Sequence, residues 1–171
     1  NLSIIGRIAC LMGCISPTII LGNIAGVNIK KEGSGNAGTT NTLRVLGAKP
    51  AIIVLVVDIL KGFIAVKIGS GIAGEMGSIV AFLCVVVGHV FPVFYKFKGG
   101  KGVATCLGAA FAVDFASAFA LLLIAVIIAA STRKMSVGSI LAAASYPVLC
   151  WFYLKAYPNY MYMAIAIALF V

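Results

Sequence analysis

The chain has 171 residues, of which 63% are hydrophobic and only 10% are charged. Soluble domains carry about 25% charged residues, so the composition excludes an ordinary soluble domain and predicts a single polytopic membrane domain over residues 1–171. The formal net charge of +9 does not by itself indicate a nucleic-acid partner, because Lys and Arg also collect in the cytoplasmic loops of membrane proteins. The five cysteines all lie in apolar stretches and form no metal-ligand spacing.

Long apolar stretches predict membrane-crossing helices along the whole chain. The expected spans are Leu2–Val27, Ala51–Ile68, Met76–Tyr95, Val137–Tyr157 and a last one that begins at about Tyr160. That last stretch has roughly a dozen residues, too few to cross a hydrocarbon core of ~30 Å at ~1.5 Å per residue. The natural protein is therefore expected to continue beyond the sequence.

The stretch Val103–Ala130 allows two interpretations. It could form one long helix of about 42 Å, or two short crossings broken at Asp114. Two crossings place the basic loops at 28–50, 96–102 and 131–136 on one side, which the positive-inside rule makes cytoplasmic. We therefore predict an all-α integral membrane protein of about seven transmembrane helices, with the N-terminus outside. Some short or broken helices should surround a site on the cytoplasmic face.

Two polar runs interrupt this apolar chain, GSGNAGTTN at 33–41 and FKGGKG at 97–102, and both fall on the predicted cytoplasmic face. Glycines let backbone N–H groups approach an anion closely, and a helix expected to start near Thr40 would favour the same anion. Two such cradles suggest a ligand set with two phosphates. The second run is not a Walker loop, because Gly102 follows Lys101 where Ser or Thr is required. The alternative is that both runs are flexible, solvated loops.

The two runs supply most of the predicted binding residues. The first would contribute Gly33, Ser34, Gly35, Asn36, Thr40 and Asn41, with Arg44 three residues further on. The second would contribute Lys98, Gly99, Gly100, Lys101 and Gly102.

Ionisable and hydroxyl residues in the spans add further candidates. Asp58 and Lys61 are three residues apart, near one face of a helix. They could form a buried ion pair that fixes packing, or Lys61 could point to the site while Asp58 holds it. His89, the single histidine, is either a hydrogen-bonded structural residue or a base. Ser136 and Ser139 either cap a helix or supply hydroxyl donors to the site.

The sequence shows no Ser-His-Asp arrangement, no Cys-His metal set and no acidic pair. An enzyme built on these residues would need an already activated substrate, with positioning and charge stabilisation as its main tools. The rival class is a carrier or channel for a phosphorylated solute, which usually shows internal repeats, and no convincing repeat is visible. A structural membrane subunit without a ligand is a third possibility.

Three motifs together resemble the bacterial acyl-phosphate:glycerol-3-phosphate acyltransferases, the PlsY family: GSGNAGTTNTLRVLG at 33–47, DILKG at 58–62 and GHVFPVFYKFKGGKGVAT at 88–105. The resemblance implies a seven-helix enzyme of the bacterial inner membrane whose active site faces the cytoplasm. It would transfer a fatty acyl group from acyl phosphate to the sn-1 hydroxyl of glycerol 3-phosphate. The products would be lysophosphatidic acid and phosphate, in the first step of phospholipid synthesis. It implies no cofactor, no metal and no acyl-CoA donor, and no nucleic-acid or obligate protein partner is expected.

The resemblance also implies roles for particular residues. Ser34 and Arg44 match residues essential for activity, and Lys101 with the surrounding glycines matches a phosphate-binding loop. One phosphate would be held by Ser34, Asn36, Thr40, Asn41 and Lys61. The other would be held by Arg44, Lys101 and Ser139. Which substrate's phosphate goes to which set stays open.

Two points of chemistry remain open at this stage. The hydroxyl proton could pass to the departing phosphate, or Asp58 or His89 could act as a catalytic base. The family also carries a third motif after the last span, with a His, an Asn and a Glu, and the sequence stops before it. The chain is therefore expected to be an incomplete form whose own activity does not follow from the resemblance.

Overall fold

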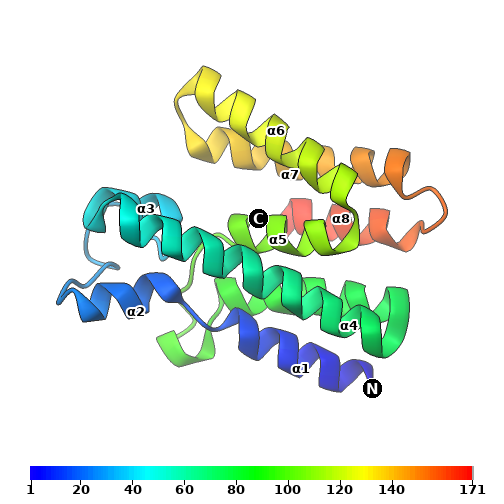
Figure 1. Cartoon of the computed structure of the whole chain (residues 1–171), viewed down its shortest axis with the longest axis horizontal. Coiled ribbons are helices and arrows are strands. Elements are labelled where there is room, and N and C mark those ends of the chain that lie inside the picture. Colours follow the sequence, from blue (N-terminus) through cyan, green and yellow to red (C-terminus); the bar gives the residue numbers. More distant parts are fainter. Residues whose placement is uncertain (171) are drawn as a thin grey trace. The chain divides into compact units, whose positions relative to one another are not determined.

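The computed structural model describes residues 1–170 and groups the chain into two compact units, Asn1–Ala109 and Ala110–Val171. The described residues form helices and turns, and no strand occurs among them (Figure 1). In the first unit, α1 (Leu2–Gly13) and the shorter α3 (Thr39–Leu46) both pack against the long helix α4 (Ala48–Val90).

The first predicted span is broken into α1 (Leu2–Gly13) and α2 (Pro17–Ile24). Pro17 causes the break, because it has no N–H to offer the carbonyl four residues earlier and its ring clashes with that carbonyl. The carbonyl in question belongs to Gly13. Ser16, the residue before the proline, is extended at φ −110° and ψ 95°, as the proline ring demands.

The second and third predicted spans form one hairpin within α4 (Ala48–Val90). Its two arms are separated by non-helical residues Ala73 and Gly74, the latter with a φ of +58°. The arms then fold back on each other so tightly that a Cβ on Gly69 or Gly77 would overlap the other residue's carbonyl oxygen. The two arms of the hairpin lie where the sequence predicted two spans.

The third span ends at Val90 and not at Tyr95 as predicted. Pro92 lies two residues beyond, where it cannot continue the helix. The chain instead forms a short 3-10 turn, η1 (Val93–Tyr95). It continues through the FKGGKG run before the next helix begins.

The predicted break at Asp114 is confirmed. The chain forms α5 (Val103–Val113, 11 residues) and α6 (Phe115–Thr132) instead of one long helix. Asp114 is the N-cap of α6, and its carboxylate accepts a hydrogen bond of 2.7 Å from the N–H of Ser117. An aspartate that caps a helix start is a local signal that sequence reading can use.

In the second unit, α6 packs against α7 (Met135–Tyr153), and α7 packs against α8 (Asn159–Phe170) (Figure 1). Gly138 of α7 lies so close to α6 that an added Cβ would come within 2.5 Å of the carbonyl oxygen of Ala125 and 3.0 Å of the Cβ of Ala129. Small residues at such crossings let helix backbones approach each other, which is the usual basis of helix packing in membranes.

Among residues 1–170, three helical stretches have the length and hydropathy to cross a membrane: Leu2–Ile24, Phe115–Thr132 and Met135–Tyr153. Helix α4 also exposes large apolar side chains along its length, among them Ile52, Ile53, Val56, Phe63 and Ile64. Within residues 1–170, the broken first segment, the two arms of α4, and α5 to α8 make up the seven predicted helical segments. The predicted all-helical membrane fold with short and broken helices is confirmed, and its orientation stays a prediction.

Candidate active site

The first polar run folds into a turn that is held by hydrogen bonds within the protein. Gly33 and Gly35 have φ values of +59° and +70°, a region that favours glycine. The N–H of Gly35 donates to the carbonyl of Glu32 at 3.0 Å. A Cβ on Gly33 would collide with the side-chain oxygen of Asn41, so this glycine is needed for space as well as for conformation.

Asn41 holds this turn together from inside the protein, where its side chain is only 1% exposed. Its Oδ1 accepts from the N–H of Ser34 at 2.8 Å, and its Nδ2 donates to the carbonyls of Ile29 and Glu32 at 3.1 Å each. Both amide N–H groups are therefore used within the protein. The side chain has no donor left for a phosphate, so Asn41 shapes the cradle and does not contact the anion through its amide.

Replacing Asn41 should destabilise the first run. Asn41→Ala leaves the Ser34 N–H and two carbonyls without their partner, which we expect to cost about 1–3 kcal/mol in the free energy of unfolding. Asn41→Asp keeps the acceptor but places a buried carboxylate oxygen against both carbonyls, so it should destabilise at least as much. Thermal unfolding in detergent measures both, with the exposed Asn159→Ala as the matched control. An Asn41→Ala midpoint equal to that of the control would contradict this role.

Helix α3 (Thr39–Leu46) starts within the first run, close to the predicted start near Thr40. Its first capping bond runs from the N–H of Thr42 to the carbonyl of Gly38 at 3.0 Å. The N–H groups of the first turn, including that of Thr40, are free of intrahelical partners and are available to an anion. Asn36 lies half-buried just before this turn, and Arg44 is exposed in the last turn of the helix.

The second polar run uses part of its backbone internally. The N–H of Gly99 donates to the carbonyl of Val90 at 3.0 Å, and that of Gly100 donates to the carbonyl of His89 at 3.3 Å. These two N–H groups are therefore not free for a phosphate. A phosphate cradle that uses the N–H groups of all the glycines in the run is not what the structure shows. The N–H groups that remain available to an anion are those of Lys101 and Gly102, immediately before α5.

The two runs meet at Gly100. A Cβ on this residue would collide with Nε2 of His89 and would lie 2.6 Å from the carbonyl oxygen of Ala37, in the middle of the first run. Only glycine allows so close an approach. Lys98 and Lys101, on either side, are exposed and can reach outward, while Gly102 has a φ of +80° that turns the chain into α5. The two predicted cradles therefore lie beside each other.

Asp58, Lys61 and His89 form one buried cluster behind this meeting point. The Nζ of Lys61 lies 2.8 Å from Oδ1 of Asp58 and 2.8 Å from Nδ1 of His89. The three side chains are at most 6% exposed. The predicted proximity of Asp58 and Lys61 on one helix face is confirmed, and His89 joins them from the second arm of α4.

Lys61 also caps the helix break between α1 and α2. Its Nζ donates to the carbonyls of Gly13 at 3.2 Å and Ile15 at 2.7 Å. These carbonyls lie just before Pro17, in the segment whose helical hydrogen bonds the proline interrupts. With Asp58 and His89 included, the ammonium has four polar neighbours for three protons. Lys61 therefore faces inward and has no proton free for a substrate phosphate.

His89 lies between this cluster and the two runs. Its Nδ1 is 2.8 Å from Nζ of Lys61 and 3.5 Å from Oδ1 of Asp58. Its Nε2 faces Gly100, where an added Cβ would collide with it. His89 therefore supports the meeting point of the two runs from behind.

Two threonines, Thr39 of the first run and Thr105, belong to the same region. Among the described residues, the hydroxyls of Thr39 and Thr105 are buried and have no hydrogen-bond partner. Thr39 lies in the first turn of α3, which begins inside the first run, and Thr105 lies in the first turn of α5, which follows the second run. Buried unsatisfied hydroxyls are rare, so both are candidate donors to a bound anion.

Ser136 and Ser139 lie in the second unit, in the first turn of α7. The expectation that they cap the helix is wrong. The N-cap position is Lys134, and the hydroxyl of Ser139 donates to the carbonyl of Ser136 at 3.0 Å. Within residues 1–170, no group of three or more His, Cys, Asp or Glu side chains could hold a metal ion.

The sequence matches a known family model over residues 3–171, the model described as "Glycerol-3-phosphate acyltransferase". A glycerol-3-phosphate acyltransferase 2 of Moorella thermoacetica is 39% identical over 95% of this chain and 84% of its own length. A glycerol-3-phosphate acyltransferase of Aquifex aeolicus is 40% identical over 93% of this chain and 83% of its own length.

The fold is also that of a solved relative. The crystal structure of PlsY (YgiH), an integral membrane glycerol 3-phosphate acyltransferase, in its glycerol 3-phosphate form superposes with a TM-score of 0.93. It is 37% identical, with 99% of this chain and 85% of that chain covered. Its lysophosphatidic acid form gives a TM-score of 0.90 at 36% identity, with the same coverage. With its buried Asp-Lys-His cluster behind two adjoining polar runs, the chain belongs to the glycerol-3-phosphate acyltransferase family of integral membrane enzymes.

Proposed function

We propose that this chain, as one membrane acyltransferase domain, transfers a fatty acyl group from acyl phosphate to the sn-1 hydroxyl of glycerol 3-phosphate. The products are lysophosphatidic acid and inorganic phosphate, and the reaction opens phospholipid synthesis. The observation that carries the proposal is the contact of Gly100 with Ala37, which brings two anion-binding runs side by side. A reaction between two phosphate-bearing substrates needs two such sites within one reaction distance.

The two phosphates divide between two groups of residues. One group comprises Ser34, Asn36 and Thr40 with the free N–H groups at the start of α3, and we add the Thr39 hydroxyl to it. The other comprises Arg44 and Lys101, with Lys98, Gly102 and the Thr105 hydroxyl as supporting members. Gly33, Gly35, Gly99 and Gly100 shape the loops, and Asn41 and Lys61 act from behind them.

The chemistry needs no covalent enzyme intermediate. The sn-1 oxygen attacks the acyl carbon, the bond from that carbon to the phosphate oxygen breaks, and the electron pair leaves with the phosphate. The hydroxyl proton passes to the departing phosphate, because the buried Asp58 carboxylate and Nδ1 of His89 both face the ammonium of Lys61. Arg44 and Lys101 stabilise the negative charge that develops on the way.

The comparisons support the acceptor and the product in this scheme, since the solved relative is described in glycerol 3-phosphate and lysophosphatidic acid forms. We place the protein in the bacterial inner membrane with its site facing the cytoplasm. The support for that orientation is charge, since the basic loops at 28–50 and 96–102 carry more Lys and Arg than Asp and Glu.

The donor is tested by supplying purified protein with glycerol 3-phosphate and either palmitoyl phosphate or palmitoyl-CoA. We expect lysophosphatidic acid from palmitoyl phosphate only. A second preparation, extended at its C-terminus with the segment that follows the last helix in relatives, tests the expected need for a third motif. Saturable glycerol 3-phosphate uptake without product from either preparation would show that the protein is a carrier and not an acyltransferase.

Arg44→Ala should reduce the turnover of acyl phosphate by about 10²–10³-fold, the usual loss when one charge-stabilising donor is removed. The guanidinium is exposed in the last turn of α3, so folding should not depend on it. Lys49→Ala removes an exposed cation shortly after it and serves as the matched control, with activity expected within twofold. Equal activity of the two variants would show that Arg44 does not take part in the reaction.

A further inference from the structure

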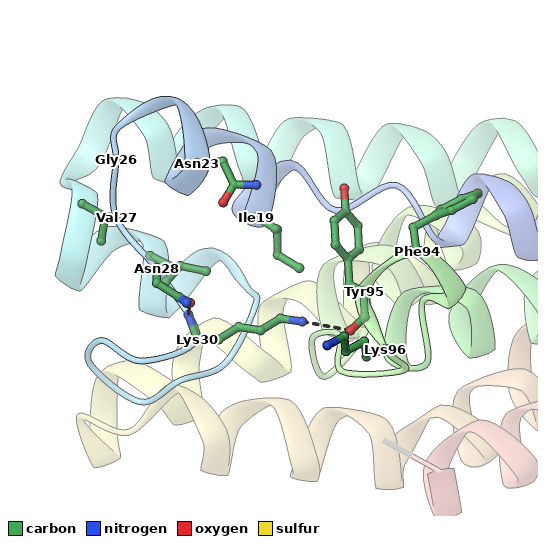
Figure 2. A pocket seen from close by; sticks show the side chains of 10 residues that line it. Ile19, Asn23, Gly26, Val27, Asn28, Lys30, Phe94, Tyr95 and Lys96 are labelled. Atoms are coloured by element: carbon green, nitrogen blue, oxygen red, sulfur yellow. Dashed lines mark hydrogen bonds between the residues drawn. The ribbon is translucent and has the colours of Figure 1, made fainter.

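A cleft of about 540 Å³ lies in the first unit, outside both polar runs. It runs between the end of α2 with the segment that follows it and the η1 turn. Figure 2 shows Ile19, Asn23 and Val27 on one side of the cleft and Phe94, Tyr95 and Lys96 on the other. Lys30 extends across it and donates from Nζ to the backbone carbonyl of Tyr95 at 3.1 Å (Figure 2).

The cleft is positively charged without internal compensation. Lys30 and Lys96 line it, and none of its described lining residues is acidic. The pKa of Lys30 is lowered from its ordinary value, first by burial and second by the charge of Lys98. A lysine that is partly withdrawn from water beside another cation is an attractive partner for an anion.

The rest of the cleft is amphipathic. The amides of Asn23 and Asn28 can donate to an anion, while Ile19, Val27 and Phe94 offer apolar surface beside them. Phe94 is 66% exposed, although it is a large aromatic residue. Lysines beside exposed aromatic and aliphatic side chains, in a protein of the bilayer, match a molecule with a charged head and a hydrocarbon tail.

We propose that this cleft binds the phosphate headgroup of an anionic membrane phospholipid. Lys30 and Lys96 contact the phosphate, the two asparagine amides donate to its oxygens or to the adjoining glycerol, and the acyl chains leave past Phe94 and Val27. The proposal goes beyond the proposed reaction and does not depend on the identity of the acyl donor.

The cleft is also connected with the active site through packing. Its floor includes Ile19 and Ile29, which form one buried cluster with Ala37 of the first polar run. Tyr95 packs against the same cluster. A lipid in the cleft therefore lies against the support of the first run and leaves the phosphate positions of the substrates free.

The test is native mass spectrometry of the protein in neutral detergent, titrated with a palmitoyl-oleoyl phosphatidylglycerol and, separately, with the corresponding phosphatidylcholine. We expect phosphatidylglycerol to bind more tightly. Lys30→Gln and Lys96→Gln should each weaken its binding about fivefold, since a lysine near an anionic lipid contributes about 1 kcal/mol. The matched control is Lys31→Gln, an exposed neighbour of Lys30 that does not line the cleft.

Lys96→Gln is the control for misfolding. Lys30→Gln removes the hydrogen bond from Lys30 to the carbonyl of Tyr95, whereas Lys96→Gln removes no hydrogen bond that holds this turn. Equal losses from Lys31→Gln and the two cleft variants would show a diffuse charge effect and overturn the proposal. Unchanged binding in both cleft variants would overturn it as well. A titration with saturating glycerol 3-phosphate separates the two sources of phosphate: displacement of the lipid would assign the cleft to a soluble ligand, and retention supports the lipid.

Discussion

Lys61→Met is expected to be among the most destabilising single substitutions in this chain. It leaves the Asp58 carboxylate, which is 2% exposed, without its cation and the carbonyls of Gly13 and Ile15 without their donor. Removing one partner of a buried ion pair costs about 3–5 kcal/mol. The thermal midpoint in detergent measures the loss, and activity should fall with it because His89 loses its anchor.

Two further variants make this expectation specific. Lys67→Met removes an exposed cation from the same arm of α4 and should leave the midpoint almost unchanged. Adding Asp58→Asn to Lys61→Met removes the uncompensated charge, so the double variant should recover part of the stability. If the double variant is less stable than Lys61→Met alone, charge burial is not the cause of the loss.

Gly100→Ala is expected to reduce activity strongly, although it adds a single methyl group. One methyl group must push Gly100 away from His89 and Ala37 and therefore separate the two polar runs. A displacement of about 1 Å in a positioned site can cost about 10²-fold in rate. We expect a loss of this size in the acyl phosphate assay.

Gly71→Ala is the matched control for this experiment. Gly71 lies in α4, where a Cβ would meet nothing within 4 Å. Alanine there should leave activity unchanged and, as the better helix former, raise stability slightly. Activity of Gly100→Ala within a few fold of this control would show that the contact between the runs does not position the substrates.

Much of the fold could be predicted from the sequence because the signals are local. The aspartate in the middle of Val103–Ala130 is a helix cap, and the basic loops required a break there, so α5 and α6 were expected. The start of α3 follows from the polar run that precedes it. The break between α1 and α2 was missed, although Pro17 carries the signal, because the flanking residues are apolar enough for a continuous span.

The hydrogen bonds and close contacts inside the site could not be predicted, because they join segments that are distant in the sequence. Nothing near Lys61 in the sequence indicates the carbonyl of Ile15, and nothing near Gly100 indicates Ala37. The spacing of Asp58 and Lys61 did predict their pairing, since three residues in a helix bring side chains together. The same spacing could not tell whether Lys61 faces a substrate or the protein interior.

The glycine run shows a related limit. GGKG predicts a backbone that can approach an anion, but the sequence does not say which N–H groups are left free. In the structure two of them donate to the end of α4, and the run's role shifts toward Lys101, Gly102 and the start of α5. Hydrogen bonds of this kind follow from where the chain reverses after Pro92, which is a tertiary property.

The central claim is acyl transfer from acyl phosphate by attack on the acyl carbon, and one isotope experiment tests it. Palmitoyl phosphate carrying ¹⁸O in the oxygen between carbon and phosphorus is incubated with the protein and glycerol 3-phosphate, using whichever of the two preparations is more active. Attack on the acyl carbon predicts lysophosphatidic acid without label and inorganic phosphate that retains the ¹⁸O. Label found in free palmitate, or no lysophosphatidic acid at all, would contradict the proposed reaction.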